Sequence, residues 1–525
     1  MSRSRLLLLM SVAIPLSACG ADDVASPGEG NIVIVTPSTP APPPPPPPPG
    51  PTGARFDAIT PAAGCPAGTA NDGTIDGDDD GSVDFRICRL AGTITGTQTL
   101  RKLDGVIYSL AGRVDVGVDM GGNGMAAGGA RGVLNIDPGV VIIGAGTSDF
   151  LVVQRGSAIN AIGTASRPIV FTARANFQND VSGNGSVNND SIGLFGGIVI
   201  LGRAPINDCD AAGASGGAAD CQTVIEGTTG AFYGGNRPND SSGTLRYVQV
   251  RYPGFEVSTG NELNGISMGG VGNGTEISHV QVHNSSDDGI EWFGGTVNGD
   301  HLVITGADDD SLDVDLGYTG TNQFIIVRQR SAGGDHYIEA DSKFDDLPRS
   351  FPTFANFTFF GGGGTGSRGV LLREGIGGNY LNGVIVGKSE CLDIDDAETV
   401  NDGSPNFQSV VLDCATPFTD DGNITVATIR TLFNMGDNNN ENFNNSLISG
   451  FINGSAEDAV TAFIYSSGDK NGGTIDPAVL QDVSYIGAVD QGATPWTQDW
   501  TCGIVGSDPQ GTDAQSSCLV TPFYG

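Results

Sequence analysis

Basic side chains are scarce in this chain. Its 525 residues include 25 Lys and Arg against 60 Asp and Glu, so the formal net charge is −35. Such a charge argues against nucleic acid, whose phosphates would be repelled, and against anionic lipid headgroups unless divalent cations bridge the two surfaces. Two interpretations of the excess acid stay open. The charge keeps an exported protein soluble, or some of the carboxylates bind calcium.

Histidine is scarce too, and no Cys-x-x-Cys pair occurs, which argues against a zinc site built from Cys and His. The chain has four histidines and nine cysteines. If one cysteine carries lipid, eight remain, an even number in an exported chain. Neighbours in the sequence suggest four disulfides, although spacing alone does not prove the connectivity. The suggested pairs are Cys65–Cys88, Cys209–Cys221, Cys391–Cys414 and Cys502–Cys518.

Runs of Ala, Leu, Glu and Lys at helical spacing are nearly absent. Aromatic residues make up only 7% of the chain and charged residues 16%, whereas there are 81 glycines. Tight turns at every strand end need residues that tolerate positive φ, and glycine does so without steric cost. The composition therefore predicts an all-β protein. A solenoid can stay one domain even at this length.

The first 18 residues predict a lipoprotein signal peptide. Two arginines precede an apolar run over residues 6–14 that is too short to span a bilayer, and Leu-Ser-Ala then leads to Cys19. This ending resembles the bacterial lipobox, in which cleavage precedes a cysteine whose sulfur is then acylated. Gly20, standing where Asp would favour the inner membrane, implies the outer membrane by the same resemblance. An ordinary signal peptide with a chance cysteine is the alternative.

Residues 19–55 predict a disordered, proline-rich tether. Residues 42–49 are an unbroken run of prolines. Such a run extends by about 3.1 Å per residue, on the order of 25 Å in all. The tether would hold the folded body away from the membrane.

A short internal repeat organises the middle of the chain. Residues 278–295 (SHVQVHNSSDDGIEWFGG) match residues 300–317 (DHLVITGADDDSLDVDLG) in pattern at nearly every position. Each copy holds two short strands with inward apolar residues at spacing two, joined by an acidic turn. The repeat is too short to hold a helix and a strand together. We therefore expect each copy to form one rung of a coil of β-strands.

The rungs align in columns of like residues. Two apolar columns are expected to face inward: Ile266, Ile290, Leu312, Ile338, Val370 and Leu392, and then Trp292, Val314, Ala340, Leu372 and Ile394. Two polar columns precede them: Asp287, Asp309, Asp335, Ser367 and Ser389, beside Asp288, Asp310, His336, Arg368 and Glu390. Rungs lie about 4.8 Å apart, so stacked carboxylates repel one another unless protons, turn amides or cations intervene. Asp287, Asp309 and Asp335 are therefore predicted calcium ligands.

A second acidic segment lies near the N-terminus. Asp76, Asp78 and Asp80 alternate with other residues and are followed by Gly81, which matches the start of a calcium loop. The twelfth position is Ile87, where an EF-hand has a bidentate Glu, and this argues against an EF-hand. Two interpretations stay open: a simpler calcium turn with these three aspartates as ligands, and a solvated acidic turn.

These features predict five regions. They are a signal peptide (1–18), a tether (19–55), an N-terminal disulfide-closed acidic region and cap (56–130), a parallel β-helix core (131–415), and C-terminal irregular rungs with a cap (416–525). Trp496 and Trp500, in the last region, are expected to cover the last hydrophobic rung. A platform on which a sugar stacks is the alternative.

Several segments resemble a known superfamily. GGIVILGRAPIN, SSDDGIEWFGGTVNG, DDDSLDVDLGYTG and the YIGA…W…DW ending resemble the pectin-lyase-like right-handed parallel β-helix superfamily, and within it a family of exported bacterial β-helix lipoproteins without a settled activity. The resemblance covers residues 130–503. It implies a right-handed parallel β-helix in the cell envelope and no particular chemistry.

Polygalacturonases share this fold and suggest an enzyme. By that resemblance Asp310 would be the acid of an inverting hydrolysis, and Asp287 and Asp309 would handle water. His336 and Arg368 would orient the substrate.

The chain also departs from the polygalacturonase pattern. Tyr337 stands where a glycine follows the histidine, and no lysine follows Arg368 in the expected cluster. A calcium-assisted polysaccharide lyase, with Arg368 or Lys388 as the base, is a further interpretation.

The features together predict first an outer-membrane lipoprotein that binds a glycan or an envelope partner at the cell surface, with calcium ordering its acidic turns. Which face of the outer membrane it occupies stays open. Glycoside hydrolysis or lyase cleavage of a uronate-containing polysaccharide is the alternative. An enzyme predicts a cleft from Asp287 to Arg368 with a carboxylate of raised pKa, whereas a binding protein predicts a flat face.

Overall fold

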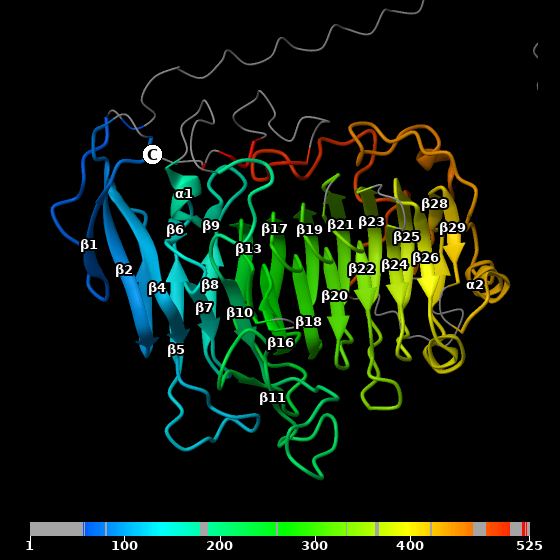
Figure 1. Ribbon diagram of the computed structural model, residues 1–525, viewed down its shortest axis with the longest axis horizontal. Coiled ribbons are helices and arrows are strands. Elements are labelled where there is room, and N and C mark those ends of the chain that lie inside the picture. The colour runs from blue at the N-terminus through cyan, green and yellow to red at the C-terminus, as the bar shows by residue number, and fades with distance from the viewer. Residues whose placement is uncertain are drawn as a thin grey trace, which may run out of the picture. The chain divides into compact units, whose positions relative to one another are not determined.

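The computed structural model describes residues 56, 58–78, 81–178, 187–258, 261–331, 333–362, 367–420, 423–465, 479–504, 517–519 and 521. Their strands wind into a right-handed parallel β-helix, as the sequence predicts (Figure 1). Strands on successive rungs pair in parallel, in the register that the internal repeat indicates: Val280 lies beside Leu302 and Ile290 beside Leu312. None of the described helices is long and apolar enough to cross a membrane.

One column of short strands carries the candidate site, and we call it the carboxylate sheet. It consists of β16 (Ile266–Val271), β18 (Ile290–Gly295), β20 (Leu312–Asp315), β22 (Ile338–Ala340), β24 (Arg368–Leu372) and β26 (Glu390–Ile394). The column continues through β29 (Thr416–Thr419) at one end, and through β10 (Gly197–Leu201), β7 (Phe150–Val153) and the last residues of β4 (Val106–Val116) at the other.

Longer, bent strands form the two remaining sides of the coil. They are β13 (Gly243–Arg251), β17 (Glu276–His283), β19 (Asn298–Thr305), β21 (Thr321–Gln329), β23 (Thr353–Gly361) and β25 (Asn379–Val386). Each bends at one residue of positive φ, from Tyr247 (51°) and His279 (54°) to Asn382 (53°). The two halves of a bent strand face different neighbours: the first half of β13 pairs with β8 (Ala158–Ile162) and the second half with β9 (Ile169–Ala173).

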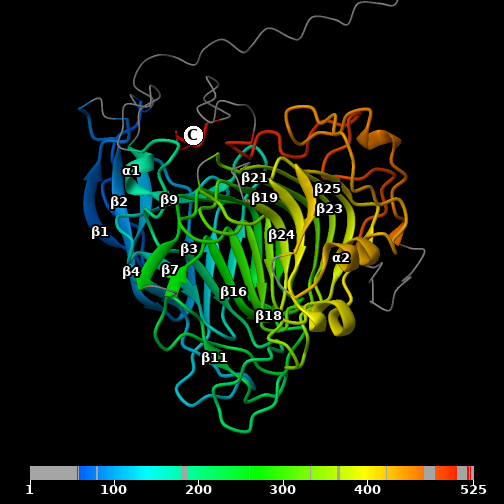
Figure 2. The ribbon, with the colours of Figure 1, turned by 45° about the vertical axis from the view of Figure 1, so that its right-hand side comes forward.

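The remaining strands lie near the ends of the coil or in excursions from it. Toward the N-terminus they are β1 (Ala70–Ile75), β2 (Phe85–Ile94), β3 (Gly96–Leu100), β5 (Gly132–Ile136) and β6 (Val141–Gly144), and toward the C-terminus β27 (Asn406–Gln408) and β28 (Val411–Asp413). Two antiparallel hairpins leave the coil: β11 (Thr223–Val224) with β12 (Phe232–Tyr233), and β14 (Phe255–Ser258) with β15 (Asn261–Leu263). The β11 hairpin lies in the long excursion at the lower edge of Figure 2.

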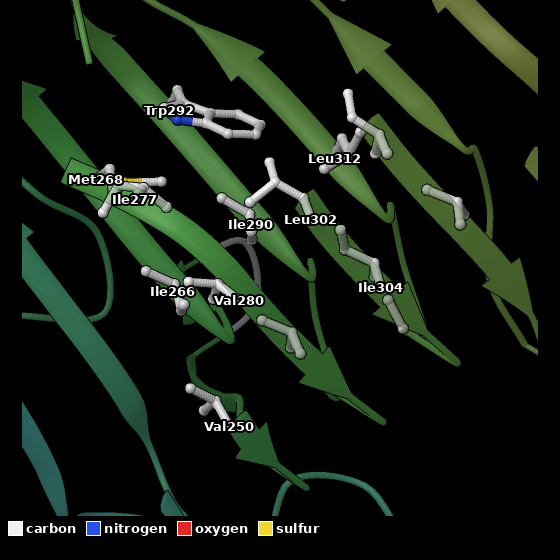
Figure 3. Packing of buried hydrophobic residues seen from close by; sticks show 14 of the residues in the cluster. Val250, Ile266, Met268, Ile277, Val280, Ile290, Trp292, Leu302, Ile304 and Leu312 are labelled. Carbon is white, nitrogen blue, oxygen red and sulfur yellow. The ribbon is translucent and has the colours of Figure 1, made fainter. Parts of the chain in front are cut away.

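The interior is a stack of apolar columns. Ile266, Ile290 and Leu312 follow one another in register, and Met268 and Trp292 lie in the column beside them (Figure 3). Val314 continues this second column. Both columns continue through Ile338, Val370 and Leu392 and through Ala340, Leu372 and Ile394, and all of these side chains are buried. The predicted inward columns are therefore confirmed.

Short helices cover parts of the coil. They are α1 (Arg174–Phe177), α2 (Val426–Phe433), a π-helix (Thr399–Gly403) and a 3-10 helix (Glu457–Ala459). The α2 side chains Ile429 and Phe433 are buried against the last rungs, with the Phe433 ring centroid 5.4 Å from that of Phe418. The expectation that Trp496 and Trp500 cover the last rung is wrong, since α2 does so.

Residues 479–504 form a C-terminal strap that runs back over the bent strands (Figure 1). Trp500 is buried and packs with Val303 and Ile326 of β19 and β21. The strap is held by buried amide side chains: Gln281 donates to the Cys502 carbonyl oxygen at 2.6 Å and accepts from the Cys502 N–H at 3.0 Å. The four disulfides join the predicted pairs of cysteines.

Candidate functional site

The turns before β18, β20 and β22 carry acidic side chains in contact from rung to rung. Asp288 Oδ1 accepts a hydrogen bond from the backbone N–H of Asp310 at 3.0 Å, and Asp310 Oδ1 accepts one from the backbone N–H of His336 at 2.6 Å. In the neighbouring column the Asp335 N–H donates to the Asp309 carbonyl oxygen at 2.9 Å. Two turn amides thus bind part of the negative charge of Asp288 and Asp310.

The imidazole of His336 lies between two carboxylates. Its Nδ1 is 2.9 Å from Asp310 Oδ1 and 3.2 Å from Glu339 Oε2. Burial disfavours the charged imidazole, but hydrogen bonds to Asp310 and Glu339 outweigh this and raise the pKa of His336 to about 10. Its buried Nε2 has no hydrogen-bond partner among the described residues, and Asp335 Oδ1 lies 3.7 Å away. His336 is therefore a buried cation at neutral pH.

Arg373 extends this network to the next rung. Its Nη2 pairs with Glu339 Oε1, and its Nε donates to both oxygens of Asp341 at 2.9 and 3.0 Å. Burial alone would raise the pKa of Glu339, but its contacts with His336, Asp310 and Arg373 lower that pKa to about 2. At Asp341 burial prevails and raises the pKa to about 7.

The outward positions of the carboxylate sheet add a second ladder of acids. The strand register places Glu291 beside Asp313 and Asp313 beside Glu339. Asn264 donates to the buried Glu291 carboxylate. Burial, followed by repulsion between neighbours, raises the pKa values of Glu291 and Asp313. These carboxylates are harder to ionise than ordinary surface acids.

Two clusters of three acidic residues lie beside this ladder, and both clusters include Asp287. One oxygen each of Asp287, Asp288 and Asp309 lies within 4.8 Å of the others, and the same holds for Glu226, Glu262 and Asp287. Glu226 follows β11 in the long excursion, and Glu262 lies in β15. Burial, and then repulsion by neighbouring carboxylates, raises the pKa of Asp287 to about 8 and that of Glu226 to about 7.

The two residues predicted as the base of a lyase, Lys388 and Arg368, contact different turns of the coil. Lys388 Nζ donates to the Asp335 carbonyl oxygen at 2.7 Å, and burial lowers the pKa of Lys388 to about 8. Arg368 Nε lies 3.3 Å from Asp393 Oδ2 and 3.6 Å from Glu390 Oε2. Lys388 therefore reaches the turn that holds His336, whereas Arg368 pairs with acids of the following rung.

Most of the side chains predicted for catalysis lie in one region: Asp287, Asp309, Asp310 and His336. Of the predicted metal ligands outside this region, Asp76 and Asp78 lie in the turn after β1, toward the N-terminal end of the coil. Asp80 and Cys19 lie outside the described residues.

Sequence reasoning missed seven charged residues of this region: Glu291, Asp313, Glu339, Asp341, Arg373, Glu226 and Glu262. Each of the first three stands between two inward residues of its strand, as Glu291 does between Ile290 and Trp292. Alternation places such a residue on the outward face. The alternation that identified the buried apolar residues therefore also indicated these outward acidic residues.

A family model described as a pectate-lyase-like β-helix domain matches residues 119–501. No curated protein matches the chain, and no solved structure matches it.

Proposed function

Because the chain belongs to the pectate-lyase-like β-helix family, we propose that it binds a polysaccharide over the carboxylate sheet with the help of Ca²⁺. Membership of the family supports a carbohydrate-related role and leaves the ligand and any activity open. The finer proposal is supported by the acidic groups around Asp287.

The observation that carries the proposal is the convergence of Asp287, Asp288 and Asp309, whose oxygens lie within 4.8 Å of one another. Within the part of the chain that the structure describes, no Lys, Arg or His side chain forms an ion pair with any of the three. Carboxylates this close repel strongly unless they bind protons or a cation. A cation would relieve the repulsion at neutral pH.

The donor set fits calcium. Ca²⁺ prefers six to eight oxygen ligands, chiefly carboxylates and carbonyls, and its other positions accept water or hydroxyl and carboxylate oxygens of a sugar. Asp287, Asp288 and Asp309 would hold the ion, and Glu226 and Glu262 converge on the same Asp287. His336 and Arg373 would hold the adjoining rung in place through their ion pairs. We therefore expect a uronate or hydroxyl-rich ligand.

Glycoside hydrolysis is the second candidate. The raised pKa of Asp310, about 7, favours it, because a general acid must be protonated near neutral pH. The burial of Asp310 favours binding instead, because its side chain is withdrawn from solvent and His336 already occupies one of its oxygens.

We further propose that the body is anchored in the outer membrane through acylated Cys19, with the proline run as spacer. The lipobox-like ending of the signal peptide supports this. Cells given a radiolabelled fatty acid should label the native chain and not Cys19→Ser. Equal labelling of both would contradict the proposal.

The binding test uses residues 20–525 and a panel of uronate-containing and neutral polysaccharides, measured with and without Ca²⁺. We expect binding that needs Ca²⁺ and is lost in Asp287→Asn/Asp309→Asn. The matched control is Asp345→Asn/Asp346→Asn, which removes the same charge from an exposed turn and should bind normally.

The same incubations, analysed for shortened or unsaturated products, separate binding from catalysis. Turnover by the parent that is absent from the double variant would replace the binding proposal with hydrolysis or lyase chemistry. Unchanged binding by the double variant would move the site elsewhere.

A further inference from the structure

The turn between β1 and β2 repeats, by spacing, much of a calcium-binding loop. Asp76, Asp78, Gly81 and Asp84 occupy the positions that are first, third, sixth and ninth in the twelve-residue EF-hand loop. Position six requires glycine for a sharp turn, and Gly81 has φ of +91°. Asp80, at position five, lies outside the described residues.

Three carboxylates of this turn converge. One oxygen each of Asp76, Asp78 and Asp84 lies within 4.8 Å of the others, and Asp78 and Asp84 are only 8% and 2% exposed. Part of this charge is bound by backbone donors. The Gly81 N–H donates to Asp76 Oδ2 at 2.8 Å, and the Gly77 N–H donates to Asp84 Oδ2 at 2.8 Å.

Asp78 leaves one oxygen unsatisfied. Its Oδ2 accepts from the Phe56 N–H at 3.0 Å, whereas its Oδ1 is buried and has no hydrogen-bond partner among the described residues. A buried carboxylate oxygen without a donor is costly, and native proteins pair such atoms with donors or metal ions. This buried oxygen is therefore available to a bound cation.

The nearby basic side chains are engaged elsewhere. Arg86, on the adjoining strand β2, donates to the Ala62 carbonyl oxygen and to Asn71 Oδ1. Arg89 lies 3.6 Å from Asp72. Neither forms an ion pair with Asp76 or Asp78 in the described part of the chain.

We propose that Asp76, Asp78 and Asp84 form a Ca²⁺ site that fixes the N-terminal end of the β-helix. An all-oxygen set of carboxylates suits Ca²⁺. The twelfth position is the buried Ile87, so the bidentate glutamate of an EF-hand is missing and the affinity is weak. We expect a Kd in the range of extracellular calcium modules, about 10⁻⁴–10⁻³ M.

The site contacts Phe56, the first residue that the structure describes. Phe56 is joined to Asp78 through its backbone N–H, and its ring lies 4.9 Å from that of Phe85 and 5.9 Å from that of Phe177, by centroids. Gly77 lets the Phe56 ring pack closely, since a Cβ there would lie 2.6 Å from Phe56 Cε2. Binding of Ca²⁺ would therefore hold Phe56 over the end of the apolar core.

The test is hydrogen exchange of residues 20–525 with and without Ca²⁺, followed by peptide. At a Ca²⁺ concentration about ten times Kd, amides of residues 56–90 that exchange by opening of the site should slow by about tenfold. Asp76→Asn/Asp84→Asn should abolish this slowing. Asp76→Asn alone, at a half-buried position, should weaken it while leaving the fold intact.

Asp287→Asn/Asp309→Asn serves as the matched control, because it removes two carboxylates from the carboxylate sheet and leaves this turn unchanged. It should retain the slowing at residues 56–90. The experiment can therefore contradict the Ca²⁺ site at Asp76, Asp78 and Asp84 without contradicting the proposed site at Asp287, and the reverse. Exchange at residues 56–90 that is insensitive to Ca²⁺ at about 10 mM, well above the expected Kd, would overturn the inference. Slowing that persists in Asp76→Asn/Asp84→Asn would do so too.

Discussion

At the scale of single residues, the fold depends on charges that satisfy one another in the interior. His336 is the clearest case, since its imidazole lies between Asp310 and Glu339 and all three are largely withdrawn from solvent. A buried pair is weak evidence for stability as such, but removal of one partner leaves a charge without compensation. Loss of His336 would therefore destabilise the fold mainly because a buried carboxylate would be left without a cation.

His336→Ala should lower the free energy of unfolding by about 3–5 kcal/mol, because the buried Asp310 would lose its cation and face Glu339, whereas Glu339 would keep Arg373. Denaturant titration followed by circular dichroism measures the change. The matched control is Asp335→Asn, whose exposed side chain lies 3.7 Å from His336 and should contribute at most about 1 kcal/mol. Equal losses in the two variants would show that the buried network is not the cause.

The polar columns at the turns could be predicted from the sequence, but the partners of the basic side chains Arg368 and Lys388 could not. Asp310 and His336 belong to one predicted column, and the structure brings them into contact. That Arg368 turns toward Asp393 while Lys388 reaches Asp335 depends on side-chain rotamers and on the depth of each turn. Neither is encoded in the spacing of residues.

At the scale of elements, each rung contributes one side chain to each column, so the columns behave as units. Trp292 stands between Met268 and Val314 in its column and is stacked on Tyr318 at 5.2 Å. The prediction of this column from period and repeat succeeded because a strand has only two faces. The strap escaped prediction, because irregular backbone that lies across a sheet leaves no period in the sequence.

Trp292→Ala should destabilise the coil by about 3–5 kcal/mol, the usual cost of removing a fully buried aromatic ring from a packed core. Thermal unfolding followed by circular dichroism measures it. Trp496→Ala is the control, since Trp496 lies in the strap and is only half-buried. If Trp292→Ala melted at the parent temperature, the interior column would not be the close-packed stack described above.

The strap should depend on buried amides at its contact with the bent strands. Gln281→Ala removes a side chain that both donates to and accepts from Cys502, so two buried backbone groups lose their partner at a cost of about 1–3 kcal/mol each. We expect faster proteolysis within residues 479–504 and a red shift of tryptophan fluorescence, with secondary structure retained. Gln98→Ala, which loses a single exposed bond to Ala67, should change neither.

At the scale of the whole molecule, stability should fall as pH rises from about 5 to 8 when Ca²⁺ is removed. Burial raises the pKa values of Asp315, Asp310 and Asp287 to about 6, 7 and 8, against about 4 for a carboxyl in the unfolded chain. The folded state therefore holds more protons than the unfolded state in this window, and its advantage is lost as pH passes through the folded pKa values. Acid denaturation of ordinary proteins runs in the opposite direction.

His336 and Glu339, whose pKa values are also shifted, do not reverse this loss of stability with rising pH. His336, whose pKa is raised to about 10, contributes stability that is complete below about 6.5 and declines toward pH 10. Glu339, whose pKa is lowered to about 2, contributes stability that is lost only when pH falls below about 4.5. Neither offsets the loss between pH 5 and 8.

Calcium should reverse the pH effect, because it competes with protons for the same oxygens and wins where the carboxylates are ionised. Melting temperatures measured at pH 5 and 8, each with chelator and with Ca²⁺, should show a Ca²⁺-induced rise that is larger at pH 8. Asp287→Asn/Asp309→Asn should flatten the pH dependence in chelator, since each amide removes a group that must otherwise release a proton. A melting temperature that rose from pH 5 to pH 8 in chelator would mean that these carboxylates are ionised and satisfied by the protein alone, and the case for a cation at Asp287 would fail.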